Sequence, residues 1–217
     1  MAIILTEKVF FQTSDNARIA ALFLPSDSKR AVILVHQFNK DKSSYASLSK
    51  LLQQSGFGVL SIDLRGHGES RGKGSLSSPE ALTPLDFQSM SKDLDASVAF
   101  LKQKGFSGFY LVGASIGANL AISFPAAHNG FCASVALSPG LDYKGLSPEV
   151  VARGTRVPLL LVASREDSYS FESATRLFSV VKAKKDFAML SNAGHGTFML
   201  SKSPDLKQKI LDWLKSN

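Results

Sequence analysis

The sequence predicts an α/β protein built on a mostly parallel sheet, and two observations lead to that prediction. Short apolar runs of the length of buried strands recur along the chain, and segments with helical spacing separate them from residue 31 onward. Such alternation implies right-handed crossovers, with helices on both faces of the sheet. The length of 217 residues fits one domain, which we expect to span residues 1–217.

The chain opens with two alternating segments, residues 7–13 and 18–24. Asp15 and Asn16 lie between them and supply turn chemistry, so the two segments are predicted to form an antiparallel hairpin. The later strands are predicted at residues 31–35, 58–62, 109–112, 134–137, 159–163 and 186–190.

Helices are predicted at residues 44–55, 86–104, 116–127, 170–181 and 205–214. The one at 86–104 is supported by Leu94, Val98 and Leu101, which recur at the spacing of one helix face. Pro125 should end or kink the helix at 116–127, because proline lacks the N–H that the helix needs.

Composition excludes several classes of protein. The net charge of +7 comes from scattered lysines and arginines, with no run of basic residues and no zinc-finger motif, so nucleic acid is not an expected partner. No apolar run reaches the roughly 18 residues of a membrane span. The single cysteine, Cys132, excludes an internal disulfide, and no signal peptide is recognisable, so a cytoplasmic location is predicted. A secreted or periplasmic location is the alternative if a signal peptide has been removed.

The strongest motif is Gly113-Ala114-Ser115-Ile116-Gly117, which stands between a predicted strand and a predicted helix. This pattern is typical of a nucleophile elbow, a sharp turn that exposes a serine oxygen beyond the carboxyl end of a strand. The two glycines leave room for the neighbouring strand and helix. The alternative is a turn serine that caps the helix.

A serine nucleophile needs a base and an acid that orients the base. Of the four histidines, His195 lies between glycines in a loop after the last strand, so we expect it to be the base. Asp167 follows the strand at 159–163 and is the predicted acid, with Asp142 as a rival. Glu166 is interpreted as a surface charge, and His36 and His67 are assigned structural roles.

The oxyanion of the tetrahedral intermediate also needs donors. We expect the backbone N–H groups of Ile116, which follows the nucleophile, and of Phe38, in the loop after the strand at 31–35. Phe38, Tyr143 and Phe198 are candidate walls of the substrate pocket, and Phe171 is a further one; each of these aromatic residues is equally compatible with the core.

These motifs together resemble the α/β-hydrolase fold superfamily over about residues 6–215, and most closely its small lidless carboxylesterases and dienelactone-hydrolase-like members. The segments on which this resemblance rests are His36-Gln37-Phe38, Asp63 to Ser70 (DLRGHGES), the elbow at Ser115, Asp167 and Gly194-His195-Gly196. In the DLRGHGES turn, Asp63 and Arg65 are expected to pair. Dienelactone hydrolases use a cysteine nucleophile, so their specific reaction is not carried over to Ser115.

Two departures from that family stand out. Gln37 occupies the position of the usual glycine in the oxyanion loop, which makes Phe38 the less secure donor. The segment 138–157 is too short for a full cap domain, so the site should be open, with partial cover from residues 71–84 and 140–154.

The expected activity is therefore hydrolysis of small or short-chain carboxylic esters through an acyl-enzyme, with no metal or organic cofactor. The same machinery could cleave thioesters, amides or peptides, because fold and triad do not select among these bonds. A catalytically silent binding module is a further alternative, and another is a basic surface module for nucleic acid or an anionic membrane, with Ser115 incidental. No oligomeric state can be read from the sequence.

Overall fold

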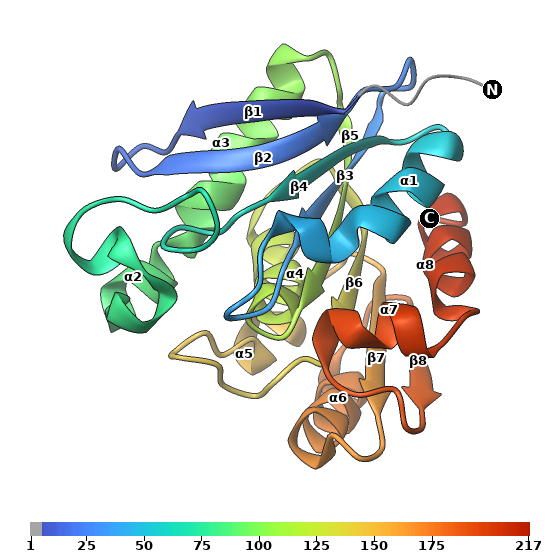
Figure 1. Ribbon diagram of the computed structural model, residues 1–217. Coiled ribbons are helices and arrows are strands. Elements are labelled where there is room, and N and C mark those ends of the chain that lie inside the picture. Colours follow the sequence, from blue (N-terminus) through green and yellow to red (C-terminus); the bar gives the residue numbers. More distant parts are fainter. Residues whose placement is uncertain (1–5) are drawn as a thin grey trace.

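The sheet is the frame of the molecule. The computed structural model describes residues 6–217, and it contains an eight-stranded sheet in the order β1-β2-β4-β3-β5-β6-β7-β8 (Figure 1). The hairpin strands β1 and β2 are antiparallel to each other, β2 is antiparallel to β4, and all later neighbours are parallel. The strands are β1 (Glu7–Gln12), β2 (Arg18–Leu24), β3 (Arg30–Val35), β4 (Gly58–Ile62), β5 (Gly108–Ala114), β6 (Phe131–Leu137), β7 (Leu159–Ser164) and β8 (Lys185–Leu190). The predicted fold class is confirmed.

Helices cover both faces of this sheet. They are α1 (Ala46–Gln54), α2 (Pro84–Gln88), α3 (Met90–Gln103), α4 (Ile116–Ala127), α5 (Glu149–Ala152), α6 (Ser168–Val180), α7 (Met199–Lys202) and α8 (Leu206–Lys215). One face packs against α1, α7 and α8, and the other against α3, α4 and α6. Val32 and Leu34 of β3 enter the first core, whereas Ile33 and Val35 enter the second, because successive strand residues point to opposite faces.

One helix prediction needs correction, and the bounds predicted for another, residues 116–127, are confirmed. The helix expected at 86–104 is two helices, α2 and α3, that meet at Ser89. Thr83 and Asp86 form a capping box that starts α2 separately on Pro84, and the apolar spacing used for the prediction belongs to α3 alone. Helix α4 continues past Pro125 and ends at Ala127.

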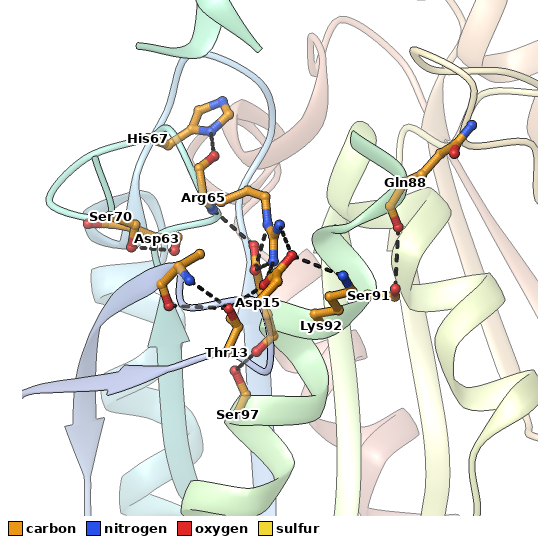
Figure 2. A network of polar contacts seen from close by, with 12 residues as sticks. Thr13, Asp15, Asp63, Arg65, His67, Ser70, Gln88, Ser91, Lys92 and Ser97 are labelled. Atoms are coloured by element: carbon orange, nitrogen blue, oxygen red, sulfur yellow. Dashed lines mark hydrogen bonds and ion pairs between the residues drawn. The ribbon is translucent and has the colours of Figure 1, made fainter. Parts of the chain in front are cut away.

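The hairpin is joined to the rest of the fold by a buried ion-pair network (Figure 2). Arg65 extends from the turn after β4 to Asp93 of α3 at 2.7 Å and to Asp15 of the hairpin turn at 2.9 Å. The expected pair of Asp63 with Arg65 is wrong. Asp63 contacts Lys42 at 2.6 Å, because Lys42 opens the turn that packs on β4.

The two segments expected to give partial cover form short elements and no cap domain. Residues 71–84 form short 3-10 turns, and residues 138–157 contain only α5 and an isolated bridge between Tyr143 and Leu146. No helix within residues 6–217 is long and apolar enough to cross a membrane. The segment 1–5, to which the signal-peptide prediction refers, lies outside the described residues.

Candidate active site

Ser115 stands on a strained turn between β5 and α4. Its φ is +54° and its ψ is −114°, a conformation that non-glycine residues rarely adopt. A Cβ at Gly113 would lie 1.9 Å from the carbonyl oxygen of Gly117, and one at Gly117 would lie 2.3 Å from that of Val35, so both positions require glycine. The Ser115 side chain makes no capping hydrogen bond to α4, so the helix-capping interpretation does not account for it.

The predicted base and acid lie at the same edge of the sheet. Nδ1 of His195, in the loop after β8, is 2.6 Å from Oδ2 of Asp167, which follows β7. The rival Asp142 has no such contact, because its carboxylate accepts hydrogen bonds from the Gly145 N–H and the Ser147 hydroxyl. With Nδ1 held by Asp167, Nε2 is the ring nitrogen that remains available to take a proton.

The hydroxyl of Ser115 and the ring of His195 are not joined by any of the hydrogen bonds found within residues 6–217. Catalytic hydrogen bonds are often long or poorly aligned before substrate binds, and they tighten in the complex. A second hydroxyl, Oγ of the fully buried Ser170, lies 3.5 Å from Nδ1 of His195 and 2.9 Å from the Tyr143 hydroxyl. Sequence reasoning missed Ser170, which carries no motif.

The two backbone N–H groups expected to bind the oxyanion form no hydrogen bond within residues 6–217. In the described part of the chain, neither the N–H of Phe38 nor that of Ile116 donates a hydrogen bond to a protein acceptor. Ile116 begins α4, whose first N–H groups lack partners within the helix and attract negative charge. No cluster of three or more His, Cys, Asp or Glu side chains suited to a metal ion occurs within residues 6–217.

The candidate pocket walls divide into two groups. Tyr143 is half-buried, and its ring lies across that of His195 with the centroids 6.4 Å apart. Burial raises the pKa of the Tyr143 phenol, while the nearby hydroxyls of Ser170 and Ser115 oppose that shift. Phe38 is half-buried and Phe198 is exposed. Phe171 lies elsewhere, because it packs on Phe187 in the core between α6 and β8.

The model of one protein family, described as serine aminopeptidase S33, matches residues 26–186. The chain belongs to this family. It is a serine hydrolase of the α/β-hydrolase fold, as the motifs predict.

Solved structures similar to this S33-family hydrolase agree with the fold. An esterase of Pyrococcus furiosus, Pf2001, has a TM-score of 0.80 at 20% identity, covering 98% of this chain and 93% of its own. A dienelactone hydrolase from Anabaena variabilis has a TM-score of 0.76 at 16% identity, covering 98% of each chain. The esterase domain of a Rhodothermus marinus protein has a TM-score of 0.75 at 21% identity, covering 97% and 98%. No curated protein sequence matches this one.

The loop that carries His195 is held by side chains from the ends of several strands. Every backbone N–H from Asn192 to Thr197, except that of His195, donates to a side-chain oxygen. The acceptors are Glu166, Ser164, Ser138 and Gln37. Glu166 is a surface charge, as interpreted, and it also holds this loop. Its carboxylate, although exposed, accepts from Gly194 and Asn192, and these contacts lower its pKa to about 2. All four acceptors stand at or just after a strand end, which is the signal that could have found them.

Gln37 makes the longest-range of these contacts. Its buried Oε1 accepts from the N–H of Thr197 at 2.7 Å and from the Thr197 hydroxyl at 2.9 Å. The unusual residue of the oxyanion loop thus links that loop to the histidine loop. A Cβ at Gly196 would lie 2.2 Å from Oε1 of Gln37, so the amide packs directly against the residue after His195.

Replacing Gln37 by leucine should destabilise the protein by about 2 kcal/mol, because two buried donors of Thr197 would lose their acceptor. Urea unfolding measures that loss, and hydrogen exchange of the Gly196 and Thr197 amides should become faster. Thr197→Val is the control, because it removes only the hydrogen bond of the hydroxyl. It should lower the free energy of unfolding by about half as much as Gln37→Leu. A Gln37→Leu protein with wild-type stability and exchange would refute this role.

His36 and His67 are buried beside the site and have structural roles. Nδ1 of His36 lies 2.8 Å from the Gln37 carbonyl, and Nε2 accepts from the Leu64 N–H at 3.0 Å. The His67 ring lies 5.0 Å from that of His36, and Nε2 of His67 has no partner within residues 6–217. Burial lowers the pKa of both rings, that of His36 to about 4.

This burial predicts acid sensitivity. The unfolded His36 titrates near its ordinary value of 6.5, so between that pH and about 4 the unfolded chain binds a proton that the folded chain does not. Stability therefore rises with pH up to 6.5, and it should fall by about 2 kcal/mol from pH 7 to pH 5. Urea unfolding across this range measures the slope. His36→Asn should flatten the slope, and an unchanged slope in that variant would contradict the assignment.

Proposed function

We propose that this S33-family serine hydrolase cleaves small carboxylic esters, with Ser115 as nucleophile, His195 as general base and Asp167 as the acid that orients it. One observation carries the proposal. A serine on a strained strand-to-helix turn shares a sheet edge with a histidine whose Nδ1 lies 2.6 Å from a carboxylate. That combination of nucleophile, base and orienting acid is the one acyl transfer requires.

In the proposed reaction, Nε2 of His195 removes the Ser115 proton as Oγ attacks the ester carbonyl. Asp167 holds the imidazole in the required tautomer and stabilises its positive charge. The N–H groups of Phe38 and Ile116 bind the oxyanion, each contributing about 3 kcal/mol. The alkoxide leaves with the proton from His195. Water then hydrolyses the acyl-enzyme by the same route and regenerates Ser115.

The surroundings favour small substrates. The segment 138–157 forms no cap domain, and Phe38, Tyr143 and Phe198 are the proposed apolar walls of an open site. Pyrococcus and Rhodothermus proteins that share this fold are described as esterases, which supports the choice of an ester bond. The location of the protein in the cell is proposed to be cytoplasmic.

Hydrolysis of p-nitrophenyl acetate, butyrate and octanoate tests the proposal. The wild type should act on the shorter esters, and Ser115→Ala should lower kcat/KM by at least about a thousandfold, because no nucleophile remains. Ser107→Ala is the matched control, since Ser107 is an exposed serine just before β5, at the other end of the same strand. Equal rates for the wild type and Ser115→Ala would contradict the proposed nucleophile.

A second candidate is cleavage of amide or peptide bonds, which the description of the matching family favours. Amino-acid p-nitroanilides and acyl thioesters belong in the same assay. Turnover of anilides or thioesters without turnover of esters would replace the ester proposal. A folded wild type that acts on none of these substrates would favour a silent binding module.

A further inference from the structure

A series of backbone hydrogen bonds and side-chain contacts connects six residues at the candidate site, which we call the rim: His195, Phe198, Lys40, Phe38, Lys144 and Tyr143. The Phe198 N–H donates to the His195 carbonyl, and Nζ of Lys40 lies 4.7 Å from the centre of the Phe198 ring.

The series closes on the other side. The Lys40 N–H donates to the Gln37 carbonyl in the turn that contains Phe38. Nζ of Lys144 lies 5.5 Å from the centre of the Phe38 ring, and the neighbouring Tyr143 ring meets that of His195. Two lysines from different loops therefore lie next to the turn that contains Phe38.

The charges of these two lysines are not neutralised by the protein. Neither Lys40 nor Lys144 forms an ion pair within residues 6–217, and both are exposed. The adjacent carboxylates are engaged elsewhere. Asp41 accepts from Ser43, Asp142 accepts from Ser147 and Gly145, and Asp167 contacts His195.

The lysines are also presented by fixed structure. Lys144 has a φ of +56° at the tip of a turn closed by the bridge between Tyr143 and Leu146. Asn119 of α4 holds this turn, because it donates to the Leu146 carbonyl at 2.6 Å and accepts from the Gly140 N–H at 3.0 Å. Contact of each ammonium with an aromatic ring further restricts the side chain.

Room for a ligand group exists beside Lys40. A groove of about 370 Å³ is lined by Lys40, Phe198 and Thr197 together with the serines at 44, 47 and 201; Asp41 and Ser43 also border it. The hydroxyls of Ser44, Thr197 and Ser201 already donate to acceptors of the protein. The Lys40 ammonium and the Ser47 hydroxyl, which forms no hydrogen bond within residues 6–217, are the donors that suit the oxygens of an anion.

We propose that the preferred substrates are esters that carry a second, anionic group such as a carboxylate, which the ammonium groups of Lys40 and Lys144 attract at the rim. The inference rests on the proposed ester hydrolysis and names its substrate class. It also disfavours substrates with a free ammonium, such as the amino-acid amides of an aminopeptidase, because the two lysine ammonium groups of the rim would repel it.

Three ethyl esters of matched chain length test the proposal: monoethyl adipate, ethyl hexanoate and ethyl 6-aminohexanoate. They are anionic, neutral and cationic near pH 7.5, and released ethanol reports turnover. The wild type should show a kcat/KM about tenfold higher for the anionic ester than for the neutral one, and lowest for the cationic one, with the differences reduced in 0.5 M salt. The Lys40→Gln/Lys144→Gln double variant should lose most of the anionic-to-neutral ratio, mainly through KM. Lys50→Gln, an exposed lysine on α1, should keep it.

Binding to Ser115→Ala separates this inference from the proposed reaction. Calorimetry should show monoethyl adipate binding at least about tenfold more tightly than ethyl hexanoate, with the difference lost in the variant that also lacks both lysines. If no ester is hydrolysed but this difference is present, the proposed reaction is wrong, and the inference that the two lysines attract an anionic group is retained. An anionic-to-neutral ratio near one in the wild type, or a ratio that survives removal of both lysines, overturns the inference, as does equal binding of the two esters to Ser115→Ala.

Discussion

Replacement of Asp167 by asparagine should lower kcat for ester hydrolysis by about 10⁴-fold with little change in stability. The carboxylate lies 2.6 Å from Nδ1 of His195, and its negative charge holds the ring proton on that nitrogen. An asparagine can turn its amide N–H toward Nδ1, which would put the ring proton on Nε2 and leave no lone pair there for the Ser115 proton. Initial rates on p-nitrophenyl butyrate measure the effect.

The matched control is Asp142→Asn, at the residue that rivals Asp167 in the sequence. Its carboxylate accepts hydrogen bonds only from its own loop, so kcat should fall by less than about tenfold. Loss of activity in Asp142→Asn combined with retention in Asp167→Asn would reverse the assignment of the acid.

Removal of Arg65 should give the largest loss of stability. Arg65 is almost fully buried, and it donates through its N–H, Nε and Nη2 to Asp93, which is fully buried. In Arg65→Met, the carboxylate of Asp93 would remain buried without its partner, which costs about 3–5 kcal/mol. Urea unfolding measures this loss, and the far end of the hairpin should exchange its amides faster, because Asp15 also loses contacts to Arg65.

Lys92 provides the control for this prediction, because it also contacts Asp15, at 3.1 Å, but is exposed. Lys92→Met should cost about 0.5 kcal/mol or less. The double variant Arg65→Met/Asp93→Leu removes both buried charges and should recover much of the stability. An Arg65→Met protein no less stable than Lys92→Met would contradict the importance of the buried pair.

Local sequence patterns predicted most of the strands and helices. The alternation in the hairpin and the apolar runs of the later strands produced the correct elements, because periodicity reflects which residues face the core. The sequence analysis predicted one helix where the structure has α2 and α3. The prediction relied on the apolar spacing of α3 and did not consider the capping box at Thr83, where α2 begins.

The parts of the site that escaped sequence reasoning depend on contacts between distant segments. The side-chain amide of Gln37 accepts a hydrogen bond from Thr197, which is near the other end of the chain. Arg65 forms its ion pair with Asp93 and not with Asp63, which is its neighbour in the sequence. Neither contact follows from spacing, because each depends on how strands and loops are arranged around the sheet. The motif at Ser115 was readable because a sharp turn imposes its own local requirement for glycine.

Covalent labelling tests the central claim, that Ser115 is the nucleophile, most directly. Wild-type protein treated with diethyl p-nitrophenyl phosphate should gain one diethylphosphoryl group, released p-nitrophenol should match it, and peptide mass spectrometry should locate the group on Ser115. His195→Ala should react far more slowly, because the serine would lack its base. A phosphoryl group on another residue, or no reaction in a protein that hydrolyses esters, would contradict the account.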